Sequence, residues 1–155
     1  MDRVADPFGL ALYAEATLGL HEDELEGKIL LDKQLDKILL ALNGVIEQDW
    51  ESELEEGNAK TEKELSLEFD TGISYQATSS FSVGFEMRNH NIIKNGELEH
   101  SALFVGPVAS YAAGTWWVTL TVLPQVTSFK RTANGALDLN EYEKVQTRLL
   151  FSFHL

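Results

Sequence analysis

The chain has 155 residues, of which 44% are hydrophobic and 24% charged, values that are ordinary for one folded domain over residues 1–155. Its 25 acidic and 12 basic residues give a net charge of −13, which argues against nucleic acid as a partner because neutralised phosphates supply most of that affinity. The chain has no cysteine, so disulfide scaffolds, thiolate metal sites and cysteine nucleophiles are excluded.

Apolar side chains alternate with small or polar ones along most of the chain, which predicts β-strands. From Phe8 to Leu20, for example, the apolar residues occupy the even positions. The segment 37–50 also has apolar residues at helical spacing, but Gly44 and the neighbouring strands favour a strand there. We therefore expect eight strands, over residues 8–20, 25–32, 37–50, 62–76, 80–94, 97–110, 115–126 and 142–155.

The expected connections differ in length. Those at 33–36, 77–79 and 111–114 are short, whereas 51–61 and 127–141 are long and polar. The acidic residues of 51–61 suit a solvated loop, with a calcium or lipopolysaccharide contact as the alternative. Asn95-Gly96 favours a two-residue hairpin turn, which would pair Met87 with Phe104.

Consecutive long strands joined in this way predict an antiparallel meander. Closure of the meander would remove its exposed edges. The expected fold class is therefore all-β, an antiparallel eight-stranded up-and-down transmembrane β-barrel forming a single domain. The alternative without a membrane is a soluble lipocalin-like barrel that binds an apolar ligand inside.

The residues between the apolar positions favour the membrane alternative. Many are small, as a crowded concave interior requires, and others carry charges of both signs in mid-strand, which must be paired at depth. We expect a lumenal charge network of Glu15, Lys28, Glu47, Glu68, Glu86, Arg88 and Arg148. Aromatic residues near the strand ends suit interfacial girdles. They are Phe8, Trp50, Tyr75, Tyr111, Trp116 and Phe153.

This layout resembles the small eight-stranded outer-membrane barrels of Gram-negative bacteria, the OmpA and OmpX type. The final residues Leu149, Phe151, Phe153 and Leu155 resemble the C-terminal signal read by the barrel-insertion machinery, although that signal usually ends in Phe. The segments 85–90, 102–107 and 116–125 resemble the C-terminal part of an uncharacterised family of predicted outer-membrane barrels. The resemblance implies a location and a fold, and it implies no activity.

No motif in the sequence indicates chemistry. His90, Glu97, Glu99 and His100 lie around the Asn95-Gly96 turn, with His100 expected opposite Asn91, but their spacing matches no metal motif. His100 and Ser101 are neighbours, and neighbours in a strand point to opposite faces, which argues against a catalytic pair. We expect no enzyme, no catalytic residue, no metal and no cofactor.

The sequence thus predicts a structural or binding protein of the bacterial outer membrane with a polar, charge-paired lumen. The alternative is a porin-like protein, either a narrow channel or a fragment of a larger transporter barrel. Expected partners are outer-membrane lipids, lipopolysaccharide and the insertion machinery, with the chain as a monomer. The first residues lack the apolar core of a signal peptide.

Overall fold

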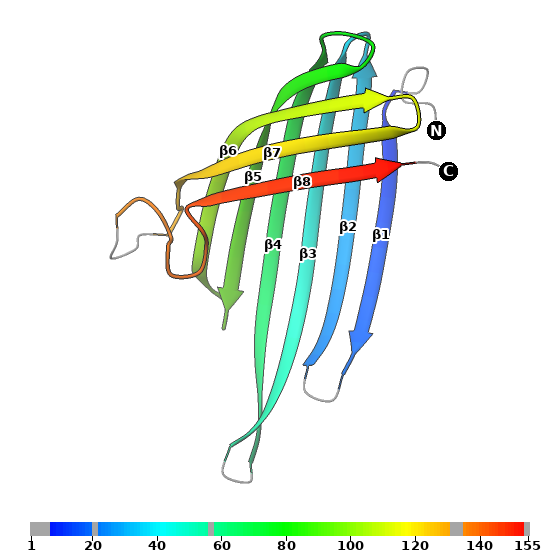
Figure 1. Cartoon of the computed structure of the whole chain (residues 1–155). Coiled ribbons are helices and arrows are strands. Elements are labelled where there is room, and N and C mark those ends of the chain that lie inside the picture. The colour runs from blue at the N-terminus through cyan, green and yellow to red at the C-terminus, as the bar shows by residue number, and fades with distance from the viewer. Residues whose placement is uncertain (1–6, 20–21, 56–57, 131–134, 154–155) are drawn as a thin grey trace.

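The computed structural model describes residues 7–19, 22–55, 58–130 and 135–153. It contains one sheet of eight antiparallel strands in chain order, each paired with the next, which confirms the predicted all-β up-and-down fold (Figure 1). The described residues include no helix long and apolar enough to cross a membrane. The strands are β1 (Gly9–Leu18), β2 (Glu22–Leu35), β3 (Ile38–Glu55), β4 (Asn58–Gln76), β5 (Phe81–Lys94), β6 (Glu97–Ala113), β7 (Trp116–Thr127) and β8 (Val145–Phe153).

The sheet is curled into a half-barrel. In Figure 1, β6, β7 and β8 cross in front of β2, β3 and β4 at a steep angle, so the sheet has a concave and a convex face. β1 pairs with β2 and β8 with β7, and the sheet order among the described residues includes no pairing of β1 with β8. The outer edges of these two strands therefore have no partner strand among the residues that the structure describes.

Two glycines lie where the sheet bends. A Cβ added to Gly84 would overlap the carbonyl oxygen of Ile73 on β4, and one added to Gly106 would overlap that of Val122 on β7. The backbones approach so closely that only a residue without a side chain fits. Glycines at such positions allow a sheet to curve sharply.

The β3–β4 connection differs from the expected one. We predicted a long polar loop over 51–61, but the two strands continue as a paired ladder as far as Glu55 and Asn58. Glu51 pairs with Glu62 in this extension. The prediction was wrong because extended backbone pairing continues beyond the apolar alternation on which we relied. Glu56 lies outside the described residues.

The β5–β6 register is also shifted from the expected one. The turn at Asn95-Gly96 forms, with positive φ at both residues, but Arg88 rather than Met87 is opposite Phe104. A β-bulge causes this shift, because Leu98 is opposite Ile93 while His100 is opposite Ile92. A shift of one residue exchanges the two faces of a strand. Phe104 therefore lies on the concave face.

The registers place the two kinds of side chain on opposite faces. The convex side carries apolar residues that remain exposed, such as Leu12 at 74%, Ile46 at 53% and Leu149 at 67% exposure. The small buried cluster of Ala102, Phe104 and Leu123 belongs instead to the concave side, where Tyr142 packs against it. This arrangement is the reverse of a water-soluble barrel, which buries its apolar face.

Candidate functional site

The concave face of the sheet collects the charged side chains. All seven residues of the expected lumenal network lie on it, since strand pairing aligns them on one side: Glu15, Lys28, Glu47, Glu68, Glu86, Arg88 and Arg148. Ion pairs join four of the seven, Glu68, Glu86, Arg88 and Arg148. The other three, Glu15, Lys28 and Glu47, lie on β1, β2 and β3.

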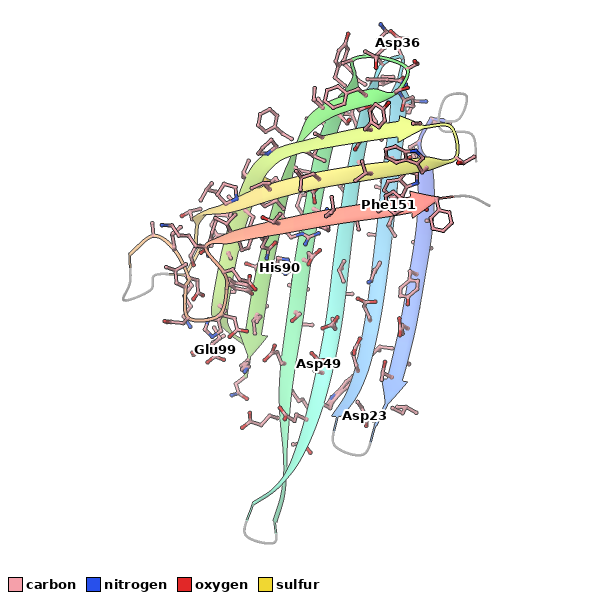
Figure 2. All side chains as sticks on the ribbon, in the orientation of Figure 1. Asp23, Asp36, Asp49, His90, Glu99 and Phe151 are labelled. Atoms are coloured by element: carbon pink, nitrogen blue, oxygen red, sulfur yellow. The ribbon has the colours of Figure 1, made fainter. Side chains whose placement is uncertain are left out.

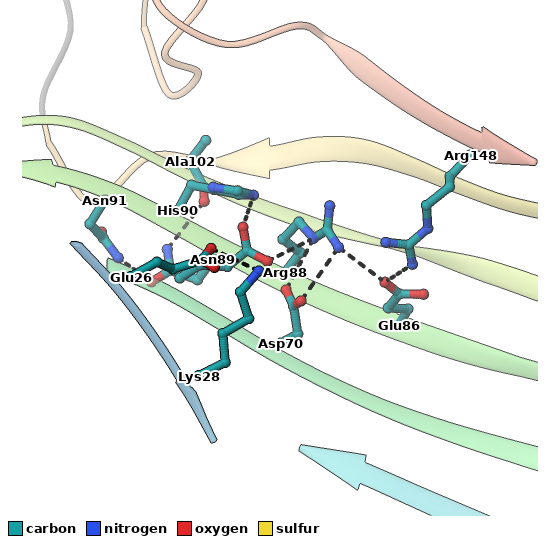
Figure 3. Close-up of polar contacts among 11 residues, drawn as sticks. Glu26, Lys28, Asp70, Glu86, Arg88, Asn89, His90, Asn91, Ala102 and Arg148 are labelled. Carbon is teal, nitrogen blue, oxygen red and sulfur yellow. Dashed lines mark hydrogen bonds and ion pairs between the residues drawn. The ribbon is translucent and has the colours of Figure 1, made fainter. Parts of the chain in front are cut away.

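Arg88 of β5 is the centre of the joined group. Its Nε lies 3.0 Å from Oδ1 of Asp70 and 3.7 Å from Oε1 of Glu68, both on β4. Its Nη2 lies 3.9 Å from Oε1 of Glu86, two residues earlier in β5. Asp70 is opposite Arg88 in the β4–β5 register, which holds the first pair in place. One guanidinium thus faces three carboxylates (Figure 3).

Arg148 connects this group to the far end of the sheet. Its Nη2 donates a hydrogen bond to Oε1 of Glu86 at 2.6 Å. Arg148 belongs to β8 and Glu86 to β5, and β6 and β7 lie between these strands in the sheet. Side chains that far apart meet only where they converge across a concave surface. This contact therefore identifies the charged face as the inner face of the curl.

His90 completes the joined group, which we call the Arg88 network: Glu68, Asp70, Glu86, Arg88, His90 and Arg148. Nε2 of His90 lies 2.8 Å from Oε2 of Glu68, while the ring packs near Tyr142 at 5.9 Å between centroids. Sequence reasoning did not assign Asp70 or His90 to this group. Their positions in the same alternation as Glu68 and Arg88 were the available signal, and we had assigned His90 to the neighbourhood of the turn.

The remaining three predicted residues lie on β1, β2 and β3. The Nζ of Lys28 pairs with Oε2 of Glu26 at 2.7 Å, and Glu15 accepts a hydrogen bond from the hydroxyl of Tyr13. Glu47 is opposite Glu26 in the β2–β3 register. Lys28 is the only basic side chain among the described concave residues of these three strands. The acidic ones are Glu15, Glu24, Glu26, Asp32, Glu47, Asp49 and Glu51.

Two cavities open on the concave face beside the Arg88 network. One of about 200 Å³ is lined by Asn43, Asp70, Glu86 and Arg148, among others. A second, of about 380 Å³, is lined by Arg88, His90, Gln146 and Arg148, among others. One water occupies about 30 Å³ of liquid, so both cavities have room for several. Their walls combine apolar side chains with the charged groups of the Arg88 network, which can hydrogen-bond to water.

The connection from β7 to β8 covers one end of this face. The buried carboxylate of Asp138 accepts a hydrogen bond from the backbone N–H of Ser101 at 3.2 Å and lies 3.0 Å from Nδ1 of His100. Tyr142 packs edge-on against Phe104 at 6.3 Å between ring centroids. Burial raises the pKa of the Tyr142 phenol above its usual range, so this group stays protonated.

His100 and Ser101, the residues considered as a catalytic pair, do not bond to each other. His100 is opposite Ile92 rather than the expected Asn91, because of the β-bulge. The Oγ of Ser101 donates to Oδ1 of Asn91 and not to His100, although a carboxylate adjoins that imidazole. Within the described residues, no group of three or more potential ligands from His, Asp and Glu is arranged to hold a metal ion.

The expected girdle aromatics lie mostly on the convex face at the strand ends. Tyr111 and Trp116 stack at 5.6 Å, and Trp116 and Phe151 at 6.0 Å. Tyr75 and Phe153 are exposed nearby at the same end of the sheet, Phe8 is exposed just before β1, and Trp50 is near the other end of β3. In the expected insertion signal Leu149, Phe151 and Phe153 are convex and exposed, and Figure 2 labels Phe151, while Leu155 lies outside the described residues.

Residues 1–155 match the model of a family of unknown function, DUF6662. The chain belongs to this family. No curated protein and no protein of solved structure matches the chain.

Proposed function

We propose that this protein is a β-barrel wall of the bacterial outer membrane, with its convex face in lipid and its concave face lining a polar lumen. A structural or binding role without catalysis agrees with the paired charges of the Arg88 network. The observation that carries the proposal is that the convex face is apolar and free of charged side chains over the central part of the described strands, whereas the charged side chains gather on the concave face.

The convex face has the composition that lipid requires. Charged side chains are missing from the described convex positions over the central part of every strand. This holds for the residues on the convex face within 10–18, 25–31, 38–50, 65–75, 81–93, 101–111, 116–126 and 145–153. An arginine or lysine on the lipid face costs about 2–4 kcal/mol at the bilayer midplane, so a membrane wall excludes it.

The length of the apolar pattern agrees with a bilayer. On β3 the convex apolar positions run from Ile38 to Ile46, and on β4 from Leu65 to Tyr75. A tilted strand needs about 9–11 residues to cross the hydrocarbon core. The rest of the β3–β4 hairpin, which includes Glu51 and Glu62, would then extend beyond the membrane into water.

The lipocalin-like alternative requires the opposite facing. A soluble barrel with an apolar ligand has its apolar residues inside and its charges outside. Here Arg148 of β8 meets Glu86 of β5 on the inside of the curl, and Phe85, the neighbour of Glu86, is 61% exposed on the outside. We therefore favour the membrane protein.

Folding with and without detergent tests the proposal. The purified, denatured chain is diluted into plain buffer or into detergent micelles, followed by circular dichroism and by gel migration of boiled and unboiled samples. We expect β-structure only with detergent and a heat-dependent shift in migration. A monodisperse β-rich protein in plain buffer would overturn the proposal.

A channel is the second candidate, and the cavities on the concave face favour it. A lumen that holds continuous water would conduct ions, whereas one filled by side chains would not. Single-channel recording in planar bilayers separates the two. Current steps that change when Arg88 or Glu68 is neutralised would indicate a conduction path along the Arg88 network.

A further inference from the structure

The outer edges of β1 and β8 have no partner strand in the described sheet. Each strand is paired on one side only in the described sheet, so a row of backbone N–H and C=O groups remains on its outer edge. Open sheet edges do not occur in the hydrocarbon region, because lipid offers no hydrogen bonds. This step depends on the proposed function, since in water the same edges would be hydrated.

We propose that β1 of one copy pairs with β8 of a second copy, and β8 of the first with β1 of the second. Two half-barrels of eight strands then close into one barrel of sixteen strands with two-fold symmetry. In a meander with an even number of strands the first and last run antiparallel, so both seams continue the existing pattern.

The two edges match in length and facing. β1 has 10 residues and β8 has 9. Setting Leu10 opposite Phe153 pairs every residue of β8 with one of β1. This register places convex residues opposite convex residues throughout, including Leu12 with Phe151 and Ala14 with Leu149.

The same register brings opposite charges together on the concave side. It places Glu15 of β1 opposite Arg148 of β8. Glu15 is exposed in the single chain, and the buried Nε of Arg148 has no hydrogen-bond partner among the described residues, its Nη2 being bonded to Glu86. Opposite charges facing each other across a strand pair stabilise the pair. The two-fold arrangement makes this contact at both seams.

Charge on the concave face favours a second copy over closure of one chain upon itself. A closed eight-stranded barrel has an interior that side chains just fill. There, Glu15, Glu26 and Glu47 would be buried together with Lys28 as the nearby cation. Acidic groups buried with so little compensation are costly. Barrels of about 16–18 strands leave an aqueous channel, in which these carboxylates remain hydrated.

Cross-linking at the seam tests this arrangement, and the cysteine-free chain gives a clean background. Ala14→Cys and Leu149→Cys are made in separate chains, which are folded together in detergent and treated with a short thiol cross-linker. We expect a covalent dimer in the mixture that neither variant forms alone. Ala14→Cys mixed with Val145→Cys is the matched control. Val145 lies opposite Leu18 in this register, so that mixture should lose the dimer.

The doubly substituted chain, with Ala14→Cys and Leu149→Cys together, identifies the alternatives. Consumption of both thiols without a dimer would show that the chain closes upon itself, which overturns the proposal. Thiols that remain unlinked in every sample would show that other strands cover the edges, which overturns it too. In both cases folding that still requires detergent leaves the membrane proposal standing, whereas folding in plain buffer removes both.

Discussion

A single arginine holds together the carboxylates of the concave face. Arg88 contacts Asp70, Glu68 and Glu86, and Glu86 passes the connection on to Arg148. Its guanidinium presents donors in several directions, as a site with three acceptors demands. At the scale of residues, the inner face is therefore organised around one position in β5.

Replacement of Arg88 should strongly lower the stability of the protein. Arg88→Gln leaves partly buried carboxylates without their cation, and breaking a buried pair in this way costs about 3–5 kcal/mol. Lys28→Gln is the control, because the Lys28 side chain is 36% exposed and contacts one carboxylate, that of Glu26, and the ring of Tyr13. An exposed pair contributes less than about 1 kcal/mol. Urea unfolding in detergent measures both, and equal losses would contradict the central role of Arg88.

The sequence assigned four members of the Arg88 network, Glu68, Glu86, Arg88 and Arg148, to one face on the basis of alternation. It could not rank them, since a pair such as Arg148 and Glu86 depends on how strongly the sheet curls. The partner of His90 could not be predicted from alternation either. Its contact with Glu68 follows from the β4–β5 register, in which the two residues are opposite each other.

At the scale of elements, each strand divides its side chains between the convex and the concave face of the sheet. On β3, Leu42 faces the convex side opposite Leu31 and Thr71, whereas Asn43 faces the concave side opposite Asp70. The two residues are neighbours in sequence and at the same depth. They therefore offer a direct comparison of the two faces.

Arginine substitution at these neighbours should have opposite results. Leu42→Arg puts a charge into lipid near the middle of the apolar band, with an expected loss of about 2–4 kcal/mol. Asn43→Arg puts the same charge beside Asp70 in a cavity with room for it, and little stability should be lost. The free energies of unfolding of the two variants, measured after folding in detergent, give the two losses. Equal tolerance of the two would mean that the assigned facing is wrong.

A β-bulge shows why strand boundaries were easier to predict than registers. The alternation located all eight strands to within a few residues, and Asn95-Gly96 located a turn. One extra residue in β6 then shifted the pairing with β5 and turned Phe104 inward. Bulges arise from local bending and twist of the sheet, which a single-strand pattern does not contain.

At the scale of the whole molecule, the distribution of charge is uneven. The Arg88 network lies on β4, β5 and β8, whereas β1, β2 and β3 present mainly carboxylates on the concave side. If two copies form one wide barrel, these acidic walls line its water. A lumen lined by carboxylates favours the passage of cations.

Ion selectivity should therefore respond to this wall. In a bilayer with a salt gradient, the reversal potential should indicate cation preference. Combined Glu24→Gln, Glu26→Gln and Glu47→Gln substitutions, which leave the proposed seam contact of Glu15 intact, should reduce that preference. Asp36→Asn, at the exposed β2–β3 turn, removes a charge outside the lumen and should leave the potential unchanged. A cation preference that is unchanged by the triple substitution would show that the acidic wall does not determine selectivity.

The sequence by itself determined the all-β class, the number and order of the strands, and which residues of most single strands share a face, because the side-chain period of a strand is two residues. Only the tertiary structure decided how far the sheet curls, that Arg148 of β8 meets Glu86 of β5, and that β1 and β8 do not pair with each other among the described residues. The physical reason is that alternation is local, whereas curvature and closure depend on twist, bulges and glycines acting along the whole sheet.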